Sequence, residues 1–290
     1  MATHSNAALP IYCNNDATWR SFLQAVFAGF TAVGLTRTTD TGQVNELTDT
    51  KPATYAYSNP SIWQLDSLTG MPIYLSVTPG ITNYANSPGL KIEIGTQTNG
   101  ASVLTGPQRS DSGSPVTLFF GAAVSGGSTS QMFVSRASGR FHFAALDPSS
   151  ASYKMFVGVE RTFDSAGTPT EDGAILYAES NGQGALGQVI PPSGTPPAVF
   201  SSLGSVFPHA IVGQSQAGSP DQRVAFLAGS WSSNGLPSQT RALVYRHTDI
   251  AELGAVNVDA FGQTDLPYMP LGDGGPGSGS GGTSYAIPWS

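Results

Sequence analysis

Cysteine, charge and long apolar runs are all scarce in this chain. Cys13 is the only cysteine among 290 residues, which excludes an intrachain disulfide and any zinc site built from several thiolates. Charged residues make up 11% of the sequence, against about 25% in an average globular protein. No apolar stretch approaches the roughly 20 residues of a membrane-spanning helix, and no signal-like segment opens the chain. We therefore expect a soluble protein, made in a cytoplasm and not inserted in a membrane.

Positive charge is the scarcest of all. The 12 Lys and Arg residues face 19 Asp and Glu residues, which leaves a formal net charge of −7. The cations are scattered along the sequence, whereas binding to phosphates needs them clustered. The composition therefore argues against nucleic acid as a partner.

Glycine, proline and aromatic residues are plentiful instead, and apolar segments are short. Because disordered chains lack aromatic and β-branched residues, this chain is expected to fold. Ten short apolar or alternating blocks are separated by turn residues, without helical patterns between them, and this predicts a mainly β protein, an antiparallel sandwich or barrel. The blocks are Ser61–Leu68, Pro72–Val77, Leu90–Gly95, Val116–Ala123, Gln131–Ser135, Arg140–Leu146, Tyr153–Val159, Ala174–Glu179, Arg223–Trp231 and Arg241–Arg246.

One segment near the N-terminus has the period of a helix. After a cap at Asn15 or Asp16, apolar residues recur at helical spacing from Trp19 to Phe30 and form a single aromatic stripe. Gly34 then follows, as is common at helix ends. We expect one amphipathic N-terminal helix that lies on the first sheet, with a partner-binding helix as the less favoured alternative.

Composition shifts twice along the chain and suggests three parts. A polar bridge at Thr105–Pro115 predicts a boundary between an N-terminal helix and β assembly domain, residues 1–105, and a sandwich-like domain, residues 106–271. Residues 272–290 begin with a Gly/Ser-rich tether. The apolar tip that follows is predicted to dock through Tyr285, Ile287 and Trp289, either on a neighbouring subunit or back on its own chain.

Three catalytic motifs are matched only in part. Residues 182–187 fit GxGxxG, but Pro191 and Pro192 forbid the helix that a nucleotide site requires, so turn glycines are expected. Asp40-Thr41-Gly42 is the triplet of aspartic proteases, yet it occurs once and among polar residues, which favours a turn. Residues 213–218 are one residue too long for the elbow of a nucleophilic serine, with Pro220 where its helix would run.

Histidine and carboxylate groups offer no complete site either. His142 lies between Phe141 and Phe143 on an expected strand, and this alternation predicts the solvent face more often than a ligand. Acidic residues gather between two strands, where they form a solvated loop by default, with glycoside hydrolysis or calcium binding as the alternatives. They are Glu160, Asp164, Glu171, Asp172 and Glu179. We expect no enzyme, no cofactor and no metal.

Three segments in a fixed order carry a resemblance to a known kind of protein. A helix from Trp19 leads to Thr39-Asp40-Thr41-Gly42-Gln43, a block at Trp63–Leu75 follows, and Leu90–Gly100 ends the series. This order resembles uncharacterised virion structural proteins of tailed bacteriophages, over roughly the first third of the chain. The resemblance implies a structural, non-enzymatic component of the tail, collar, baseplate or capsid surface, located in the virion after synthesis in the host bacterium.

Such a protein would bind copies of itself and other virion proteins. Low charge fits this expectation, since the cores of protein interfaces are depleted in charge and enriched in aromatics. The alternative is a receptor-binding or carbohydrate-binding module of a tail fibre or tip, in which exposed Trp63 or Trp231 would stack on a host glycan. A tail depolymerase ranks third.

Overall fold

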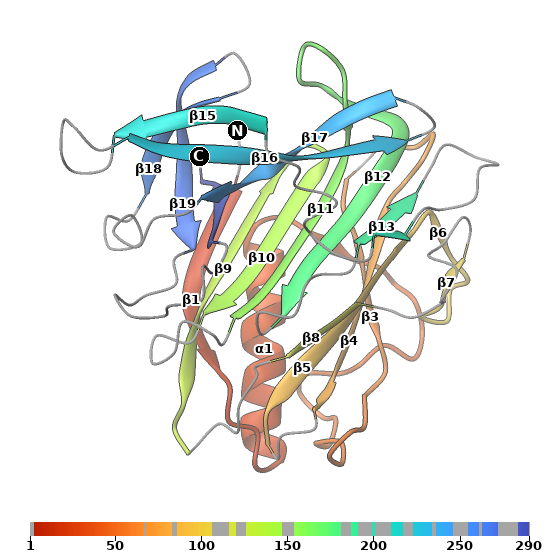
Figure 1. Ribbon diagram of the computed structural model, residues 1–290. Coiled ribbons are helices and arrows are strands. Elements are labelled where there is room, and N and C mark those ends of the chain that lie inside the picture. The colour runs from red at the N-terminus through yellow and green to blue at the C-terminus, as the bar shows by residue number, and fades with distance from the viewer. Residues whose placement is uncertain are drawn as a thin grey trace.

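The computed structural model is mainly β, with twenty strands and one helix among the residues that the structure describes. It confirms the predicted class: antiparallel sheets with one helix near the N-terminus (Figure 1). The structure describes residues 3–66, 68–82, 86–105, 116–119, 126–146, 154–180, 187–190, 199–200, 210–216, 223–233, 236–245, 255–260, 263–271 and 284–289. No described helix has the length and apolar character needed to cross a membrane.

A seven-stranded antiparallel sheet runs through the middle of the molecule (Figure 1). Its strand order is β1-β9-β10-β11-β12-β13-β14, so the N-terminal strand pairs with a strand that follows more than a hundred residues later. The strands are β1 (Thr3–Pro10), β9 (Thr129–Ala137), β10 (Arg140–Leu146), β11 (Lys154–Phe163), β12 (Pro169–Ser180), β13 (Gly187–Ile190) and β14 (Val199–Phe200).

Two further sheets follow the helix. A five-stranded sheet has the order β2-β3-β4-β5-β8, and a two-stranded sheet pairs β6 with β7. The strands of the five-stranded sheet are β2 (Thr36–Arg37), β3 (Ser61–Gln64), β4 (Tyr74–Ile81), β5 (Pro88–Gly95) and β8 (Val116–Phe119). The two-stranded sheet consists of β6 (Gln97–Thr98) and β7 (Leu104–Thr105).

The C-terminal part forms a closed barrel of six strands in the order β15-β16-β17-β20-β19-β18. The ring closes where Gly213 of β15 pairs with Ala260 of β18. The last strand, β20, lies between β17 and β19. The strands are β15 (Ala210–Gln216), β16 (Arg223–Ser233), β17 (Leu236–Tyr245), β18 (Val256–Ala260), β19 (Gln263–Leu271) and β20 (Ser284–Pro288).

The helix α1 (Asp16–Ala32) forms where its stripe and cap predict it. Asn15 is the N-cap, and it exchanges hydrogen bonds with Thr18 in a capping box. The stripe is buried and packs between two sheets: Phe30 makes edge contacts with Phe141 of β10 and with Trp63 of β3. The helix approaches β9 closely at Gly29, where an added Cβ would lie 2.7 Å from the terminal methyl of Met132.

One hydrophobic core joins the helix, the seven-stranded sheet and the five-stranded sheet. It contains residues from Leu9 to Ala178, and two ladders cross the boundary predicted between residues 105 and 106: β1 with β9, and β5 with β8. Residues on both sides of that predicted boundary therefore share one core. The bridge at 106–115 and the tether at 272–283 lie outside the described residues.

Candidate functional site

Two of the predicted docking residues, Tyr285 and Ile287, lie in β20, a strand of the barrel of their own chain, and the third, Trp289, follows directly after this strand. Ala286 and Ile287 are fully buried, and the backbone of Tyr285 pairs with Val244 and Leu271. Of the two alternatives predicted for the apolar tip, this arrangement is the one in which the tip docks on its own chain. Contact of Tyr285, Ile287 and Trp289 with a neighbouring subunit stays a prediction.

Trp289 joins the end of the barrel to the seven-stranded sheet. Its ring lies 4.3 Å from the ring of His4 and 5.8 Å from that of Phe133, measured between centroids. Its backbone N–H donates to the carbonyl of Pro267, and the hydroxyl of Ser135 donates to the carbonyl of Pro288. The two ends of the chain consequently lie near each other, beside the top of β1 (Figure 1).

A buried polar network lies on the face of the seven-stranded sheet opposite the helix, and we take it as the candidate site. The carboxylate Oε1 of Glu160 accepts from the hydroxyl of Tyr177 at 2.5 Å and lies 2.7 Å from Nε2 of His142. All three side chains are fully buried. An ionised carboxylate only accepts, so Nε2 carries the imidazole proton in this arrangement. Nδ1 of His142 has no hydrogen-bond partner among the described residues.

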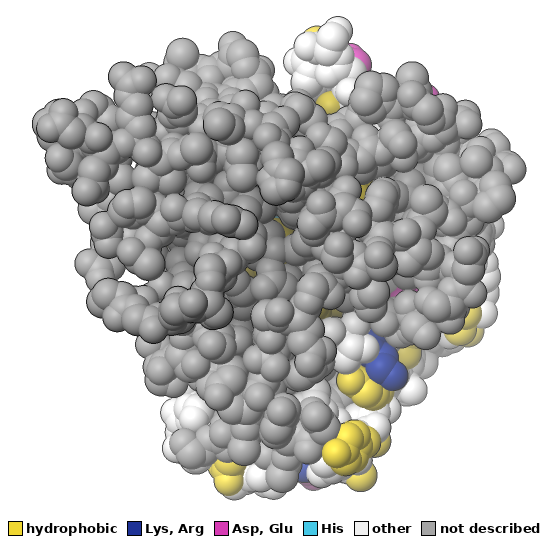
Figure 2. Space-filling view, in the orientation of Figure 1, with side chains coloured by type: hydrophobic (Ala, Val, Ile, Leu, Met, Phe, Trp, Pro, Cys, Tyr) yellow, Lys and Arg dark blue, Asp and Glu magenta, His cyan; other side chains and the backbone are white. Residues whose placement is uncertain are grey.

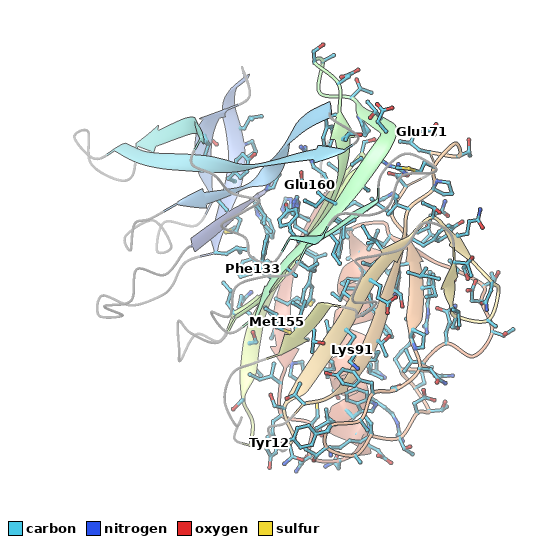
Figure 3. The ribbon with its side chains drawn as sticks, turned by 45° about the vertical axis from the view of Figure 1, so that its right-hand side comes forward. Tyr12, Lys91, Phe133, Met155, Glu160 and Glu171 are labelled. Atoms are coloured by element: carbon cyan, nitrogen blue, oxygen red, sulfur yellow. The ribbon has the colours of Figure 1, made fainter. Side chains whose placement is uncertain are left out.

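Strand register explains how three separate strands meet at this point. His142 of β10 pairs with Gly158 of β11, and Gly158 pairs with Tyr177 of β12, so the three residues form one row across the sheet. Glu160 lies two residues beyond Gly158 and points to the same face, because side chains alternate along a strand. Glu160 is labelled in Figure 3, and its strand, β11, contacts β17 of the barrel.

Gly158 makes room for the phenol. A Cβ at this position would lie 2.2 Å from Cζ of Tyr177 and 2.4 Å from its hydroxyl oxygen, distances that real Cβ atoms do not adopt. The ring of Tyr177 therefore lies directly over the glycine and reaches across β11 toward His142. Any side chain at residue 158 would displace the hydroxyl from the carboxylate.

Two sequence expectations are wrong at this site. His142 is not on a solvent face, and Glu160 is not in a solvated loop: both are fully buried on strands. The predicted alternation around His142 is confirmed, since Phe141 and Phe143 face the core on the opposite side of the sheet. No local pattern around these strands indicates that the polar face is covered as well, because the covering strands come from the distant C-terminal part.

A second buried polar contact ties the five-stranded sheet to the seven-stranded one. Arg161 of β11 makes two hydrogen bonds to the carboxylate of Asp66, of 2.7 Å and 2.8 Å, and a third to the carbonyl of Met71. Arg136 of β9 donates to the carbonyls of Leu65 and Gly34. Both guanidinium groups thereby fix the segment between β3 and β4, which the sequence had not singled out.

The remaining acidic candidates have structural contacts at the rim. Glu171 accepts from the backbone N–H of Gly70 at 2.8 Å, and Asp164 accepts from the N–H groups of Ala166 and Thr168 within its turn. Glu179 is on β12, but its side chain lies outside the described residues. The cluster predicted from sequence is thus split among a buried network, a loop contact and a turn.

The partial motifs also have local roles where they are described. Gly42 adopts a φ of +74° in a turn, and Asp40 accepts from the hydroxyl of Thr98 and the N–H of Ser102. Gly187 begins a strand and not a helix, whereas residues 182–186 lie outside the described part. Ser215 lies near the end of β15, where it pairs with Val224. The described parts of the three partial motifs are therefore turns or strands.

Trp63 and the thiol of Cys13 are both buried. Trp63 is 2% exposed and packs in the core, so it is not available as the stacking platform of the alternative carbohydrate-binding hypothesis, while the side chain of Trp231 is not described. Burial raises the pKa of the Cys13 thiol to about 12, and nearby Lys51 offsets this in part. The described residues contain no group of three or more His, Cys, Asp or Glu side chains placed to hold a metal ion.

The buried network contains a carboxylate, a phenol and an imidazole, which are groups able to transfer protons. All three are fully buried, and their hydrogen bonds join strands β10, β11 and β12. The chain matches no family model, and comparison with curated proteins and with solved structures gives no match.

Proposed function

We propose that this protein is a structural, non-enzymatic component of a tailed-phage virion, working through contacts with its own copies and with other virion proteins. The proposal starts from the resemblance of the first third of the sequence. The candidate positions in such a particle are the tail, the collar, the baseplate and the capsid surface.

The observation that carries the proposal is how the fold uses its few charged groups. Arg37 donates to Gln43, Val44 and Glu46, and in this way it organises the segment after β2. Arg136 and Arg161 fix the segment between β3 and β4, and Glu171 binds its Gly70. Charge that holds segments of one fold together is typical of a structural part.

The composition supports the same role. Charged residues make up only 11% of the sequence, and hydrophobic side chains are among the small described part of the face drawn in Figure 2. A surface poor in charge desolvates at low cost, and such surfaces are found in the centres of protein interfaces.

Mass spectrometry of purified particles tests the proposal directly. Particles banded by density from lysates of the culture that carries the gene should contain the chain in a fixed ratio to the other virion proteins. Its absence from particles, with the protein present in the lysate, would refute the proposal.

A second candidate is a receptor-binding or carbohydrate-binding module. It is favoured by Trp289, a partly exposed indole beside the exposed ring of His4. Binding to a glycan array that is lost in Trp289→Ala would select this function. No binding at millimolar sugar would reject it.

A further inference from the structure

The first strand, β1, is an edge of the seven-stranded sheet. It pairs with β9 on one side, and its other side pairs with no strand in the described part of the chain. Such an edge presents a row of backbone donors and acceptors that can pair with another chain.

The register identifies the groups that point outward. The N–H of Ile11 donates to the carbonyl of Ser128, so residue 11 points toward the β9 side. Hydrogen-bonding direction alternates along an antiparallel strand. The N–H groups of His4, Asn6 and Ala8 therefore point away from β9, and Pro10, which has no N–H, takes the last outward position.

The usual protections of an edge strand are weak here. Natural edge strands carry charged residues, proline, bulges or very short lengths. β1 is eight residues long, contains no Lys, Arg, Asp or Glu, and keeps an unshifted register with β9 along its whole length. Pro10, at its end, is the one protective residue, and His4, Asn6 and Ala8 are exposed or partly exposed.

An aromatic group adjoins this edge on one face of the sheet. The partly exposed ring of Trp289 lies beside His4, and that of Phe133 lies beside Trp289. Residues His4, Asn6 and Ala8 share one face of the sheet. Aromatic residues next to an uncharged strand are the composition of an interface centre. The edge thus combines backbone pairing with apolar contact.

Resting on the assembly role proposed above, we propose that β1 pairs with β1 of a second copy of this chain and joins two seven-stranded sheets. Pairing of identical antiparallel strands is two-fold symmetric, so each outward donor of one copy finds an acceptor of the other. A second copy also fits the charge: the chain carries a net charge of −7, but none of its acidic residues lies on β1. The strands can meet without direct repulsion between like charges.

Sedimentation equilibrium of the full chain and two variants tests the pairing, from about 1 µM to about 100 µM because association follows protomer concentration. Asn6→Pro removes an outward N–H and keeps the β9 ladder, and Ala8→Lys places a charge at the edge. Ala101→Lys, at an exposed alanine in the turn between β6 and β7, is the matched control. Far-UV circular dichroism confirms that each variant is folded.

We expect wild type and Ala101→Lys to form dimers, with the dimer dissociation constant raised at least about tenfold in both β1 variants. Hydrogen exchange gives an independent measurement: the amides of residues 4, 6 and 8 should become protected as concentration rises, while those of 5, 7 and 9 are protected throughout. A wild-type monomer over the whole range would overturn the inference, as would variants that associate like wild type.

The outcomes separate this inference from the proposed function. If wild type associates and the β1 variants associate equally well, the β1 interface is wrong and the assembly role stands. If the chain is monomeric but is found in purified particles, the virion role stands without self-pairing. Association only with a strand of another virion protein would also reject the second copy as partner.

Discussion

The two faces of the seven-stranded sheet are buried by different means. The face toward the helix is apolar, with Met132, Phe141, Val157 and Leu176 in one core with α1 and the five-stranded sheet. The face toward the barrel carries the hydroxyl, imidazole, carboxylate and phenol groups of Ser135, His142, Glu160 and Tyr177, all of them buried. The same strands therefore contribute a mainly apolar layer on one side, and on the other a layer in which hydrogen-bonded groups lie beside apolar ones such as Phe156.

This difference has an energetic consequence. Apolar packing tolerates many sequences of suitable volume, whereas a buried polar group that loses its partner keeps the full cost of desolvation. The helix face should therefore determine how stable the sheet is. The barrel face should determine how the C-terminal part is positioned on it.

Removing the last strand should have the largest effect. A chain that ends after Gly272 lacks β20, so β17 and β19 lose their shared partner and the buried Ile287 is lost. We expect unfolding free energy to fall by more than about 3 kcal/mol, from lost apolar burial alone. Urea denaturation followed by fluorescence measures this change. Trp289→Ala, which keeps the strand pairing, should cost clearly less, and an unchanged midpoint for the truncated chain would show that β20 does not stabilise the barrel.

The helix face is tested by Phe30→Ala. Phe30 is fully buried and contacts Trp63, Phe141 and Phe143. A cavity at this point should lower the unfolding free energy by about 3–5 kcal/mol. Leu47→Ala, at a side chain that is 66% exposed, is the control and should change it by less than about 0.5 kcal/mol. If Phe30→Ala and Leu47→Ala lowered the unfolding free energy equally, Phe30 would not lie in the core that stabilises the fold.

The barrel face is tested by Tyr177→Phe. The change removes the hydroxyl that donates to Glu160 and keeps the ring over Gly158. We expect a loss of about 1–3 kcal/mol in unfolding free energy, because a buried carboxylate loses a donor. Tyr55→Phe, at an exposed tyrosine, should be neutral. If Tyr177→Phe is also neutral, the network does not contribute to stability and the contrast between the faces fails.

Gly158→Ala tests the same network without removing a polar group. The new methyl group would collide with the ring of Tyr177, and overpacking of this kind costs about 1–3 kcal/mol. At Gly126, by contrast, a Cβ would lie 3.7 Å from Tyr12 in an ordinary contact. Thermal melting of both variants should show a clear decrease for Gly158→Ala and little change for Gly126→Ala. The additional change Tyr177→Ala should relieve the collision.

The smallest effect is expected at the rim, which belongs to neither face. The double change Glu171→Gln and Asp172→Asn keeps side-chain size and removes two charges. Exposed carboxylates contribute at most about 1 kcal/mol, and Glu171 and Asp172 are both exposed, so melting and oligomeric state should stay close to wild type. A large loss of solubility or assembly would give these residues a role that their contacts with the described residues do not explain.

Much of the fold was predictable where the local sequence pattern agrees with the tertiary structure. The helix begins at the expected cap and buries the expected stripe, and each of the ten predicted blocks overlaps a strand. β1 was missed because Thr3–Pro10 is mostly polar and small, with no alternation. β20 was expected as an apolar tip that docks, yet its place between β17 and β19 has no local signature.

The sequence by itself determined the class of the fold, the helix and the apolar face of the central sheet, because these depend on periodicity and turn residues within short segments. Only the tertiary structure decided the burial of His142 and Glu160, the pairing of β1 with β9, and the closing of the barrel by β20. These features join residues that are far apart in the chain. The covering of a polar face depends on a partner that local sequence does not contain, and the side chains on that face look like those that face water.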